Sequence, residues 1–523
     1  MAALALKLGT RRSALARAQS AAVARQLEQL HPGLAVELIG IDTRGDRIVD
    51  RPLSSIEGKE FFTAEIDAAL LRGEVDFTVH SYKDLSLDRS ARLLLAAVPR
   101  REQPRDIVLL RRDVAEHLAA GRELVIGSSS PRRASFVPEF LRGMLPHRGG
   151  ASAQVRVADL RGNVDSRLRR LHEPRGRPGH VDGIVLAFAG LARLWSEPSS
   201  RALLRELYSP LPRMLLPLSA CPAAPAQGAL AIECRCDDAA TAALLRGIDD
   251  MPTRRAVEVE RALLAERGGG CHQRFGATQI ELPALGSLLY LREAGERDGA
   301  LELRKSQLRW TPETPLPQPT GTIDAWDGSR AERASIESIE AGAALAEKRL
   351  PSVEALFVTH RQALPEAASV RINPAAHVWV PGLDTWQALA ERGVWVEGCA
   401  ESLGFASLQG LLAEPLLQLP PANRWTVLTH AEAASAWSGT EVIATYRHRA
   451  QAGDDEAAAA PSAHSTHLYW HSGAQFERWR GRVGALAQHA CGPGKTFEHL
   501  CLAGVQNLRM FPNAAQWREW LGL

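Results

Sequence analysis

The sequence predicts an α/β protein of several domains, and three observations lead to this expectation. The chain has 523 residues, which exceeds what one hydrophobic core usually holds. Its hydrophobic and charged fractions, 45% and 23%, are typical of a soluble globular protein. Strand-like runs alternate with segments whose apolar residues recur at helical spacing, which is typical of parallel sheets connected by helices. Ligands of such sheets usually bind at the carboxyl ends of the strands.

The alternation begins at residue 4. Residues 4–10, 34–42 and 75–81 are strand-like, whereas residues 11–31 and 63–74 carry apolar residues at helical spacing. Further strand or strand–helix segments follow at 101–110, 123–141, 155–171 and 181–194.

A smaller α+β region is expected after these units. A helix at 254–266 leads into a glycine–cysteine loop, and strand-like residues follow at 286–295 and 300–310. The proline-rich stretch 311–322 is interpreted as a loop inserted in this region, because a helical pattern resumes at 335–350.

From residue 351 the α/β alternation returns, and the acidic, alanine-rich stretch 451–465 interrupts it as a flexible crossing. The predicted domains are therefore 1–100 with 215–237, 101–214, 238–350 and 351–523.

Charge and cysteine content argue against several classes of protein. The formal net charge is only +2, so the chain as a whole does not bind polyanions through its bulk charge. No run of about 18 apolar residues predicts a membrane span, and the first 19 residues do not follow the pattern of a secretory signal. The seven cysteines are scattered, and no Cys/His spacing is that of a zinc site. We expect a cytoplasmic protein with free thiols, no bound metal, and no membrane or nucleic-acid partner.

Arginines recur where predicted strands give way to helices. The segments are GTRRS with Arg11, Arg12 and Ser13, GSSSPRR with Ser128, Ser130, Arg132 and Arg133, LRGNVDSR with Arg161 and Arg167, and AGLARL with Arg193. Helix N-termini and guanidinium groups both bind carboxylate or phosphate. Any single arginine in these segments is equally well interpreted as a solvated surface side chain. The recurrence of arginine at four strand ends nevertheless favours a ligand with many acid groups. Nucleic acid is the alternative ligand, and the low aromatic content argues against it.

The segment VHSYKDL places Lys83 and Asp84 at the end of a predicted strand. A carboxylate at a ligand-facing edge can carry protons or stabilise a developing cation, and a neighbouring lysine favours its ionised form. A bare dipeptide of this kind is more commonly an exposed ion pair.

The segment ERGGGCHQRFG places Cys271 after three glycines, with no second cysteine nearby. Glycine adopts backbone conformations closed to other residues and lets a bulky group approach the chain. Cys271 is therefore a candidate for covalent chemistry, and a small buried cysteine is the alternative.

Taken in order, these segments resemble hydroxymethylbilane synthase (porphobilinogen deaminase). The resemblance is nearly continuous from residue 1 to about 350, in GTRRSALA, GKEFFTAEIDAALL, VHSYKDL, GSSSPRR, LRGNVDSRL, PAQGALAIECR and GGGCHQRFG. The family joins four porphobilinogen units head to tail and releases ammonia, on a dipyrromethane cofactor bound through a thioether. The resemblance implies two periplasmic-binding-protein-like lobes with the active site between them, and a small third domain.

The same resemblance implies roles for individual residues. Cys271 would hold the dipyrromethane, and Asp84, beside Lys83, would assist loss of ammonia and stabilise the cationic intermediates. The side chains expected to bind carboxylates of the cofactor and growing bilane are Lys83, Arg11, Ser13, Ser128, Ser130, Arg132, Arg133, Arg161, Arg167 and Arg193. We expect a monomer whose partners are porphobilinogen and the growing bilane.

Residues 351–523 resemble a different family, uroporphyrinogen-III synthase, in a shortened form. The resemblance is carried in order by HVWVPGLDTWQALAERG, NRWTVLTHAEAA, HLYWHSGAQFERW and HACGPGKTFEHL. That synthase closes hydroxymethylbilane while inverting its last ring, and it uses few side chains. The implied substrate-facing positions are Thr385, Tyr446, Ser472 and Thr496.

Two alternatives stay open. The first strand–helix units of the synthase are missing from residues 351–523. We therefore give equal weight to a catalytically active region and to a purely structural one. The whole chain could also be a non-catalytic, polycarboxylate-binding protein on the same two-lobed fold.

Overall fold

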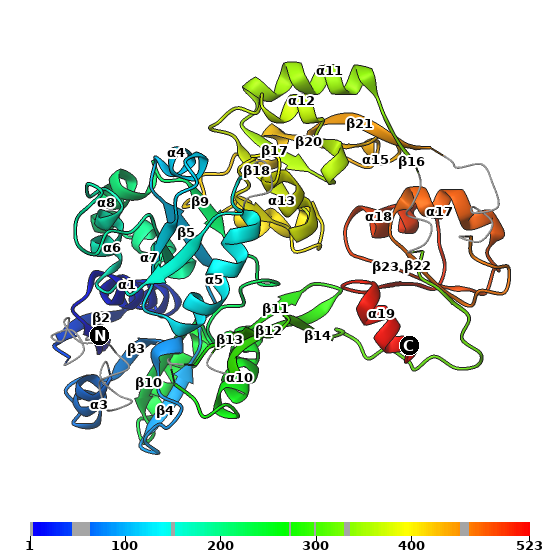
Figure 1. Cartoon of the computed structure of the whole chain (residues 1–523). Coiled ribbons are helices and arrows are strands. Elements are labelled where there is room, and N and C mark those ends of the chain that lie inside the picture. Colours follow the sequence, from blue (N-terminus) through cyan, green and yellow to red (C-terminus); the bar gives the residue numbers. More distant parts are fainter. Residues whose placement is uncertain are drawn as a thin grey trace. The chain divides into compact units, whose positions relative to one another are not determined.

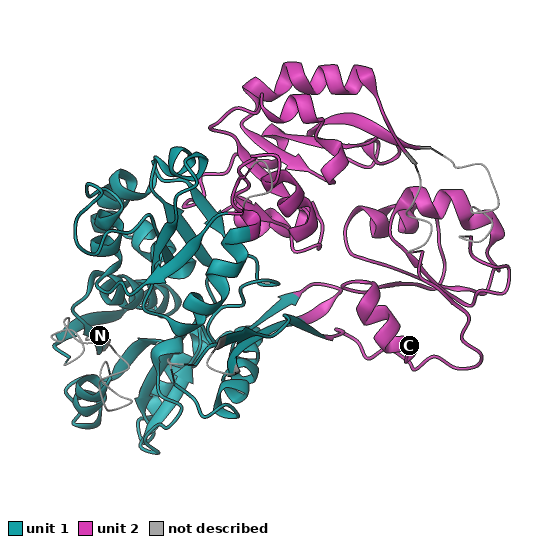
Figure 2. Ribbon diagram, in the orientation of Figure 1, with its two compact units in different colours: residues 1–142, 153–281, 288–309 teal, residues 143–152, 282–287, 310–523 magenta. Residues whose placement is uncertain are grey.

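The structure of the protein is a computed structural model, and it describes residues 4–43, 63–147, 152–270, 273–297, 300–328, 335–449 and 460–523. The chain divides into two compact units (Figure 2). Unit 1 holds residues 1–142, 153–281 and 288–309, and unit 2 holds residues 143–152, 282–287 and 310–523. Within the described residues, no helix has the length and apolar character needed to cross a membrane.

The first lobe of unit 1 is a five-stranded sheet packed by helices (Figure 1). Its strand order is β2 (Leu34–Ile41), β1 (Leu4–Arg11), β3 (Phe77–Ser81), β10 (Leu230–Arg235) and β4 (Leu93–Ala97). Strand β1 pairs in parallel with β2 and β3, whereas β10 is antiparallel to β3 and β4. Helices α1 (Ala14–Leu30) and α3 (Ala64–Leu71) pack against the sheet. Leu8, Leu27 and Phe77 are fully buried in the core between them.

The second lobe of unit 1 repeats this plan. Its strand order is β7 (Val155–Ala158), β6 (Leu124–Gly127), β8 (Gly183–Ala187), β5 (Asp106–Leu110) and β9 (Arg213–Leu215). Its helices are α4 (Val114–Ala119), α5 (Pro131–Met144), α6 (Val164–Arg170), α7 (Phe188–Ser196) and α8 (Pro198–Tyr208). Strands β6, β7 and β8 are parallel, and β5 is antiparallel to β8 and β9.

The predicted α/β class is confirmed, and the sheets of both lobes combine the expected parallel pairs with antiparallel ones. The chain crosses from β4 to β5 and returns from β9 to β10. A strand that arrives from the other lobe enters its sheet from the opposite end, so it pairs antiparallel. The predicted boundaries between the lobes, at residues 100, 214 and 237, stay predictions.

Beyond β10 the chain forms a smaller set of elements. Helices α9 (Ala239–Leu245) and α10 (Met251–Ala265) precede a four-stranded sheet. Its strands are β11 (Phe275–Leu282), β12 (Gly286–Arg297), β13 (Ala300–Leu303) and β14 (Gln307–Thr311). Between α10 and β11, Gly268, Gly269 and Gly270 have φ of +80°, +69° and +93°. The expectation that this loop needs glycine is confirmed, since other residues rarely adopt that region. Cys271 itself lies outside the described residues.

Unit 2 contains two further sheets. The six-stranded sheet has the order β16 (Ser335–Ser338), β21 (Glu441–Arg449), β20 (Trp425–His430), β17 (Ala355–Val358), β18 (His377–Val380) and β19 (Gly398–Cys399). The four-stranded sheet has the order β15 (Ala325–Trp326), β22 (His467–Trp470), β23 (Gln488–Cys491) and β24 (Leu508–Met510). The helices of unit 2 are α11 (Glu340–Arg349), α12 (Glu366–Ser369), α13 (Leu383–Ala390), α14 (Gln409–Leu412), α15 (Ala431–Ala434), α17 (Gly473–Trp479), α18 (Lys495–Leu502) and α19 (Ala514–Leu521).

The prediction that residues 311–350 belong with the third domain is corrected by the sheets of unit 2. Strand β15 pairs with β22, and β16 pairs with β21. The physical reason lies in apolar packing, because Trp310 and Ile323 join the core of Tyr469, Phe511 and Trp517. The ring of Trp310 lies 5.0 Å from that of Phe511. The C-terminal unit therefore begins about 40 residues before the predicted boundary.

Candidate functional site

A cavity of about 660 Å³ lies in unit 1 where several strands end. Its lining includes Arg11 at the end of β1, Ser81 at the end of β3 and Ser129 just beyond β6. It also includes the turn 161–167 after β7 and residues 186–194 across the end of β8. The cavity therefore lies at the carboxyl ends of these strands, where the sequence predicted a ligand site. Both lobes contribute to the site.

The structure brings most of the predicted carboxylate-binding residues together in this cavity. Those that line it are Arg11, Ser13, Lys83, Arg133, Arg161, Arg167 and Arg193, and the predicted catalytic residue Asp84 lines it as well. Ser128, Ser130 and Arg132 are not among the lining residues, and Cys271 lies outside the described residues.

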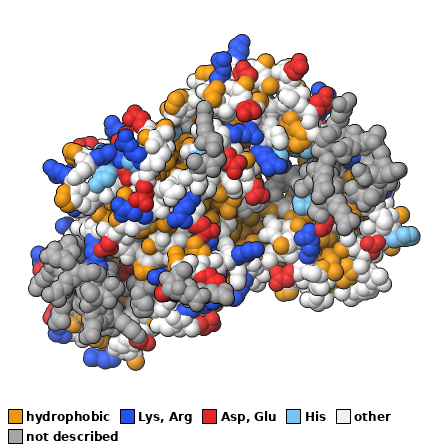
Figure 3. Space-filling model, in the orientation of Figure 1, with side chains coloured by type: hydrophobic (Ala, Val, Ile, Leu, Met, Phe, Trp, Pro, Cys, Tyr) orange, Lys and Arg blue, Asp and Glu red, His pale blue; other side chains and the backbone are white. Residues whose placement is uncertain are grey.

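The cavity is locally basic. Among the described residues that line it, seven are cationic and three are carboxylates: Arg11, Arg12, Lys83, Arg133, Arg161, Arg167 and Arg193 against Asp42, Asp84 and Asp165. On the face drawn in Figure 3, basic and acidic side chains are interspersed. The net charge of the chain is only +2. The excess of cations is therefore a property of the cavity and matches a ligand with several acid groups.

Lys83 and Asp84 lie in the short helical turn that follows β3. The Nζ of Lys83 donates a hydrogen bond to Oε1 of Gln227 at 3.3 Å. Burial lowers the pKa of Lys83, and the neighbouring carboxylate of Asp84 offsets this only in part. Arg261 of α10 donates to the carbonyl oxygens of Tyr82 and Leu85, both at 3.1 Å. These bonds hold the turn on which Asp84 lies.

Asp106, the first residue of β5, is the centre of a buried charge network. Its carboxylate accepts hydrogen bonds from Nη2 of Arg132 and Nη2 of Arg133, each at 2.7 Å. Gln227 donates a third, from Nε2 at 2.8 Å. Burial alone would raise the pKa of Asp106, but the two guanidinium groups hold it far below its usual value.

Arg132 has a different position from the one predicted. Its Nη1 donates to the carbonyl oxygen of Pro222 at 2.8 Å, while Nη2 is bound to Asp106. The side chain is buried between β5 and the segment that returns to the first lobe. Both terminal nitrogens of Arg132 therefore contact protein acceptors and the side chain does not line the cavity, so its role as a ligand-binding residue stays a prediction.

Arg167 and Arg193 fit an anionic ligand. Burial lowers the pKa of Arg193 to about 10, and burial together with Arg133 and Arg161 lowers that of Arg167 to about 10. Arg167 donates to the carbonyl oxygen of Gly162 and Arg193 to that of Gly228. Within the described part of the chain, no carboxylate lies within ion-pair distance of either guanidinium. A bound carboxylate would supply the missing counter-charge.

Some lining residues were missed from the sequence. Among them are Gln19 and Gln227. Gln19 of α1 donates to Oγ of Ser81 at 2.9 Å across 62 positions of the chain, and no local pattern shows this pair. For Gln227 a signal existed in the segment PAQGALA, where Gly228 has φ of +88° and lies against the carbonyl of Glu102.

The four residues predicted in the C-terminal half lie in two lobes of unit 2. Thr385 on α13 and Tyr446 on β21 are buried beside the six-stranded sheet. Ser472 and Thr496 lie together beside the four-stranded sheet, and both hydroxyls serve local structure. The Oγ of Ser472 caps α17 by accepting from the N–H of Gln475, and Oγ1 of Thr496 donates to the carbonyl of His471.

Known proteins resemble the first half of the chain. The family described as porphobilinogen deaminase, dipyromethane cofactor binding domain, matches residues 6–243. A porphobilinogen deaminase of Acidothermus cellulolyticus is 43% identical over 281 residues, covering 53% of this chain and 75% of that protein. Those of Brevibacillus brevis and Roseiflexus sp. (strain RS-1) are each 40% identical, and the alignments cover 52% and 57% of this chain and 78% and 88% of those proteins. Among solved structures, YhfZ from Shigella flexneri aligns over 52% of this chain and 93% of that one, at 14% identity and a TM-score of 0.23. This TM-score is too low to support an argument.

Proposed function

Because the chain belongs to the porphobilinogen deaminase family, a family of transferases in tetrapyrrole biosynthesis, we propose that unit 1 joins four porphobilinogen units into hydroxymethylbilane with release of ammonia. The basic cavity at the carboxyl ends of β1, β3 and β6 is the observation that carries this proposal. Porphobilinogen and its products are polycarboxylates, and the seven cationic side chains supply matching donors.

The matched domain is the one that binds the dipyrromethane cofactor. We propose that Cys271 attaches it through a thioether; when bound, the group supplies the two-ring primer to which substrate units are added. The residues proposed to hold its carboxylates are Arg11, Ser13, Lys83, Arg133, Arg161, Arg167 and Arg193. The described residues fit the group, since Arg167 and Arg193 are half-buried with no carboxylate partner among them. Ser128 and Ser130, though outside the cavity lining, stay in the proposal through the loop that they form around Ser129.

Asp84 is the proposed catalytic residue. Its carboxylate lies on the cavity wall, next to Lys83, in a turn fixed by Arg261. A carboxylate in this position can move a proton to the departing ammonia and stabilise the positive charge that develops on the substrate carbon. Gln227 is a proposed positioning residue, because its side chain bonds both Lys83 and Asp106.

Intact-protein mass spectrometry tests this proposal against a non-catalytic polycarboxylate-binding protein. The protein is produced in cells that make porphobilinogen, with Cys271→Ser as the matched variant. We expect the wild type to carry an added mass of two linked pyrrole units, and the variant to carry none and form no bilane. A wild type with no added mass and no turnover would favour the binding protein.

We propose in addition that unit 2 is a uroporphyrinogen-III synthase-like domain that closes the bilane. The separation of residues 310–523 into their own two-sheet unit supports a distinct activity there. Thr385, Tyr446, Ser472 and Thr496 are the proposed substrate-facing residues. The test is the isomer of the cyclic product made by the full chain without added synthase. Type III product supports the proposal, and type I product alone contradicts it.

A further inference from the structure

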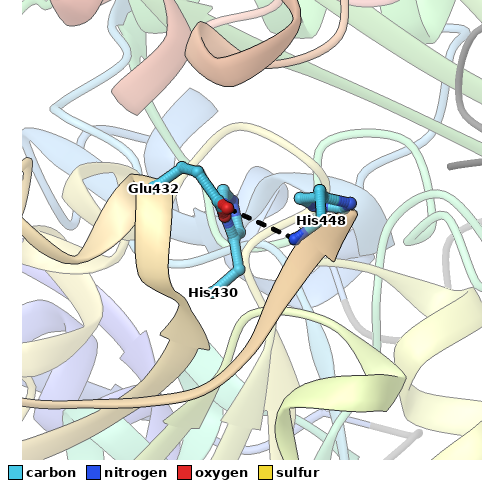
Figure 4. Close-up of side chains that lie close together, drawn as sticks. All are labelled: His430, Glu432 and His448. Carbon is cyan, nitrogen blue, oxygen red and sulfur yellow. Dashed lines mark hydrogen bonds and ion pairs between the residues drawn. The ribbon is translucent and has the colours of Figure 1, made fainter. Parts of the chain in front are cut away.

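Three side chains in unit 2 with metal-ligand chemistry converge at one place (Figure 4). His430, Glu432 and His448 each offer one ligand atom, and these atoms all lie within 4.8 Å of one another. The sequence predicted no metal because His430 and His448 are 18 positions apart, which matches no familiar zinc spacing. The parallel pairing of β20 and β21 brings them together.

The cluster lies where a ligand of an α/β sheet is expected. His430 is the last residue of β20, Glu432 follows it in α15, and His448 lies near the end of β21. The imidazole rings of His430 and His448 are 4.9 Å apart. Three residues from the carboxyl ends of two neighbouring parallel strands therefore point to one spot.

Glu432 is already oriented toward both histidines. Its Oε2 lies 2.9 Å from Nδ1 of His430, and its Oε1 accepts a hydrogen bond from the backbone N–H of His448 at 3.3 Å. A carboxylate held from two sides loses little side-chain freedom when it binds an ion. A metal ion bound to Nδ1 of His430 would replace this contact with Glu432, and the neutral imidazole would then carry its proton on Nε2.

The donor set selects the kind of ion. Two imidazoles and one carboxylate suit Zn²⁺ and similar first-row divalent ions better than Mg²⁺ or Ca²⁺, which prefer oxygen. At metal–ligand distances of about 2.0–2.2 Å, tetrahedral ligands lie about 3.3 Å apart. The present spread of up to 4.8 Å requires a contraction of about 1.5 Å, which rotations of partly exposed side chains allow.

A second cluster in the described residues, Asp67 with His80 and Glu233, does not offer the same opportunity. Arg89 occupies its centre and donates to both carboxylates, to Asp67 at 2.7 Å and to Glu233 at 2.5 Å. The guanidinium already supplies the positive charge that a metal ion would bring. By contrast, no arginine or lysine in the described part of the chain forms an ion pair with Glu432.

We propose that His430, Glu432 and His448 form a site for one divalent first-row metal ion, with Zn²⁺ as the best match. Three protein ligands leave a coordination position for water or a ligand oxygen, as in catalytic rather than structural zinc sites. Tyr446 borders the site, with its ring 5.6 Å from that of His430 and 5.5 Å from that of His448. The site is independent of the activity proposed for either unit.

The test uses full-length holoprotein, dialysed against a chelator and titrated with Co²⁺ as a spectroscopic probe and then with Zn²⁺. Exposed thiols such as Cys236 and Cys501 are alkylated first, so that thiolate ligands do not contribute. The variants are Glu432→Gln and His448→Gln. His499→Gln is the matched control, because His499 forms an exposed pair with Glu477 at 3.0 Å in the same unit.

We expect one Co²⁺ per chain, with visible absorption of a low-coordinate nitrogen–oxygen site and displacement by Zn²⁺. Loss of one ligand should lower the metal affinity by at least about 100-fold, because the loss of a residue that only orients a ligand already lowers metal affinity about 10- to 100-fold. His499→Gln should change affinity less than about twofold, and circular dichroism checks that each variant is folded. The proposal is overturned if the wild type binds no stoichiometric ion, or if folded Glu432→Gln and His448→Gln bind it as tightly as the wild type.

Discussion

Asp106→Asn probes the buried charge network beneath the cavity. Asp106 is fully buried and receives hydrogen bonds from Arg132, Arg133 and Gln227. Asparagine preserves the shape and one acceptor oxygen but removes the negative charge. The two guanidinium groups, themselves 3% and 7% exposed, would then lie in the interior without a counter-charge.

The expected loss of stability is large. Breaking a buried ion pair by removing one partner typically costs about 3–5 kcal/mol. The matched control is Asp113→Asn in the same lobe, whose carboxylate also receives two bonds from one arginine, Arg175, at 2.9 Å. The Asp113 side chain is 41% exposed, so its pair should contribute less than about 1 kcal/mol.

Hydrogen exchange measured by mass spectrometry reports the stability of unit 1 separately from that of unit 2, because peptides that cover β5 and β8 come from unit 1 alone. A loss of 3–5 kcal/mol corresponds to exchange that is about 100- to 4,000-fold faster at these strands. Asp113→Asn should change the rate by less than about sixfold.

The effect has a defined pH dependence. The pKa of Asp106 in the folded state lies below that of an unfolded aspartate, about 3.9. Its contribution is therefore present above about pH 4 and is lost as pH falls toward the lowered folded-state pKa. The difference between wild type and Asp106→Asn should shrink on acidification below about pH 4. Equal exchange rates for Asp106→Asn and Asp113→Asn at neutral pH would refute the reasoning.

Two further changes test the site. Gly228→Ala should destabilise unit 1 by at least about 1–2 kcal/mol, because the residue has φ of +88° and a new Cβ would lie 2.6 Å from the carbonyl oxygen of Glu102. Thermal unfolding measures this loss of stability, and an unchanged unfolding midpoint would contradict the prediction. Arg167→Gln should raise the KM for porphobilinogen about 10- to 150-fold, because a hydrogen bond to a charged group contributes about 1.5–3 kcal/mol to binding. Arg170→Gln on the same helix, where Arg170 forms a half-exposed pair with Glu173, should leave KM unchanged, and equal effects of the two changes would show that Arg167 has no special role.

The sequence predicted that the arginine-bearing strand ends meet at one place. GTRRS, LRGNVDSR and AGLARL all contribute side chains to one cavity, because the carboxyl ends of parallel strands meet at the same edge of a sheet. The left-handed glycines before Cys271 were also foreseen, since a run of three glycines is typical of backbone that residues with a Cβ rarely adopt.

What the sequence did not show depends on partners far along the chain. Arg132 binds Asp106, 26 residues away, and so turns from the cavity to the interior. The boundary near residue 350 was misplaced because Trp310 packs with Phe511, about 200 residues later. The His430–Glu432–His448 cluster depends on the register of β20 and β21, which no local spacing contains.

The most direct test of the central claim is turnover of porphobilinogen by Asp84→Asn. The variant keeps the shape of a side chain on the cavity wall and changes none of the described cationic residues around it. We predict that intact-mass measurement finds the two-ring group on the variant when it is reconstituted with preformed bilane, while bilane formation falls by at least about 100-fold, the lower range for loss of a positioned acid–base group. Wild-type turnover by a cofactor-loaded Asp84→Asn would contradict the account.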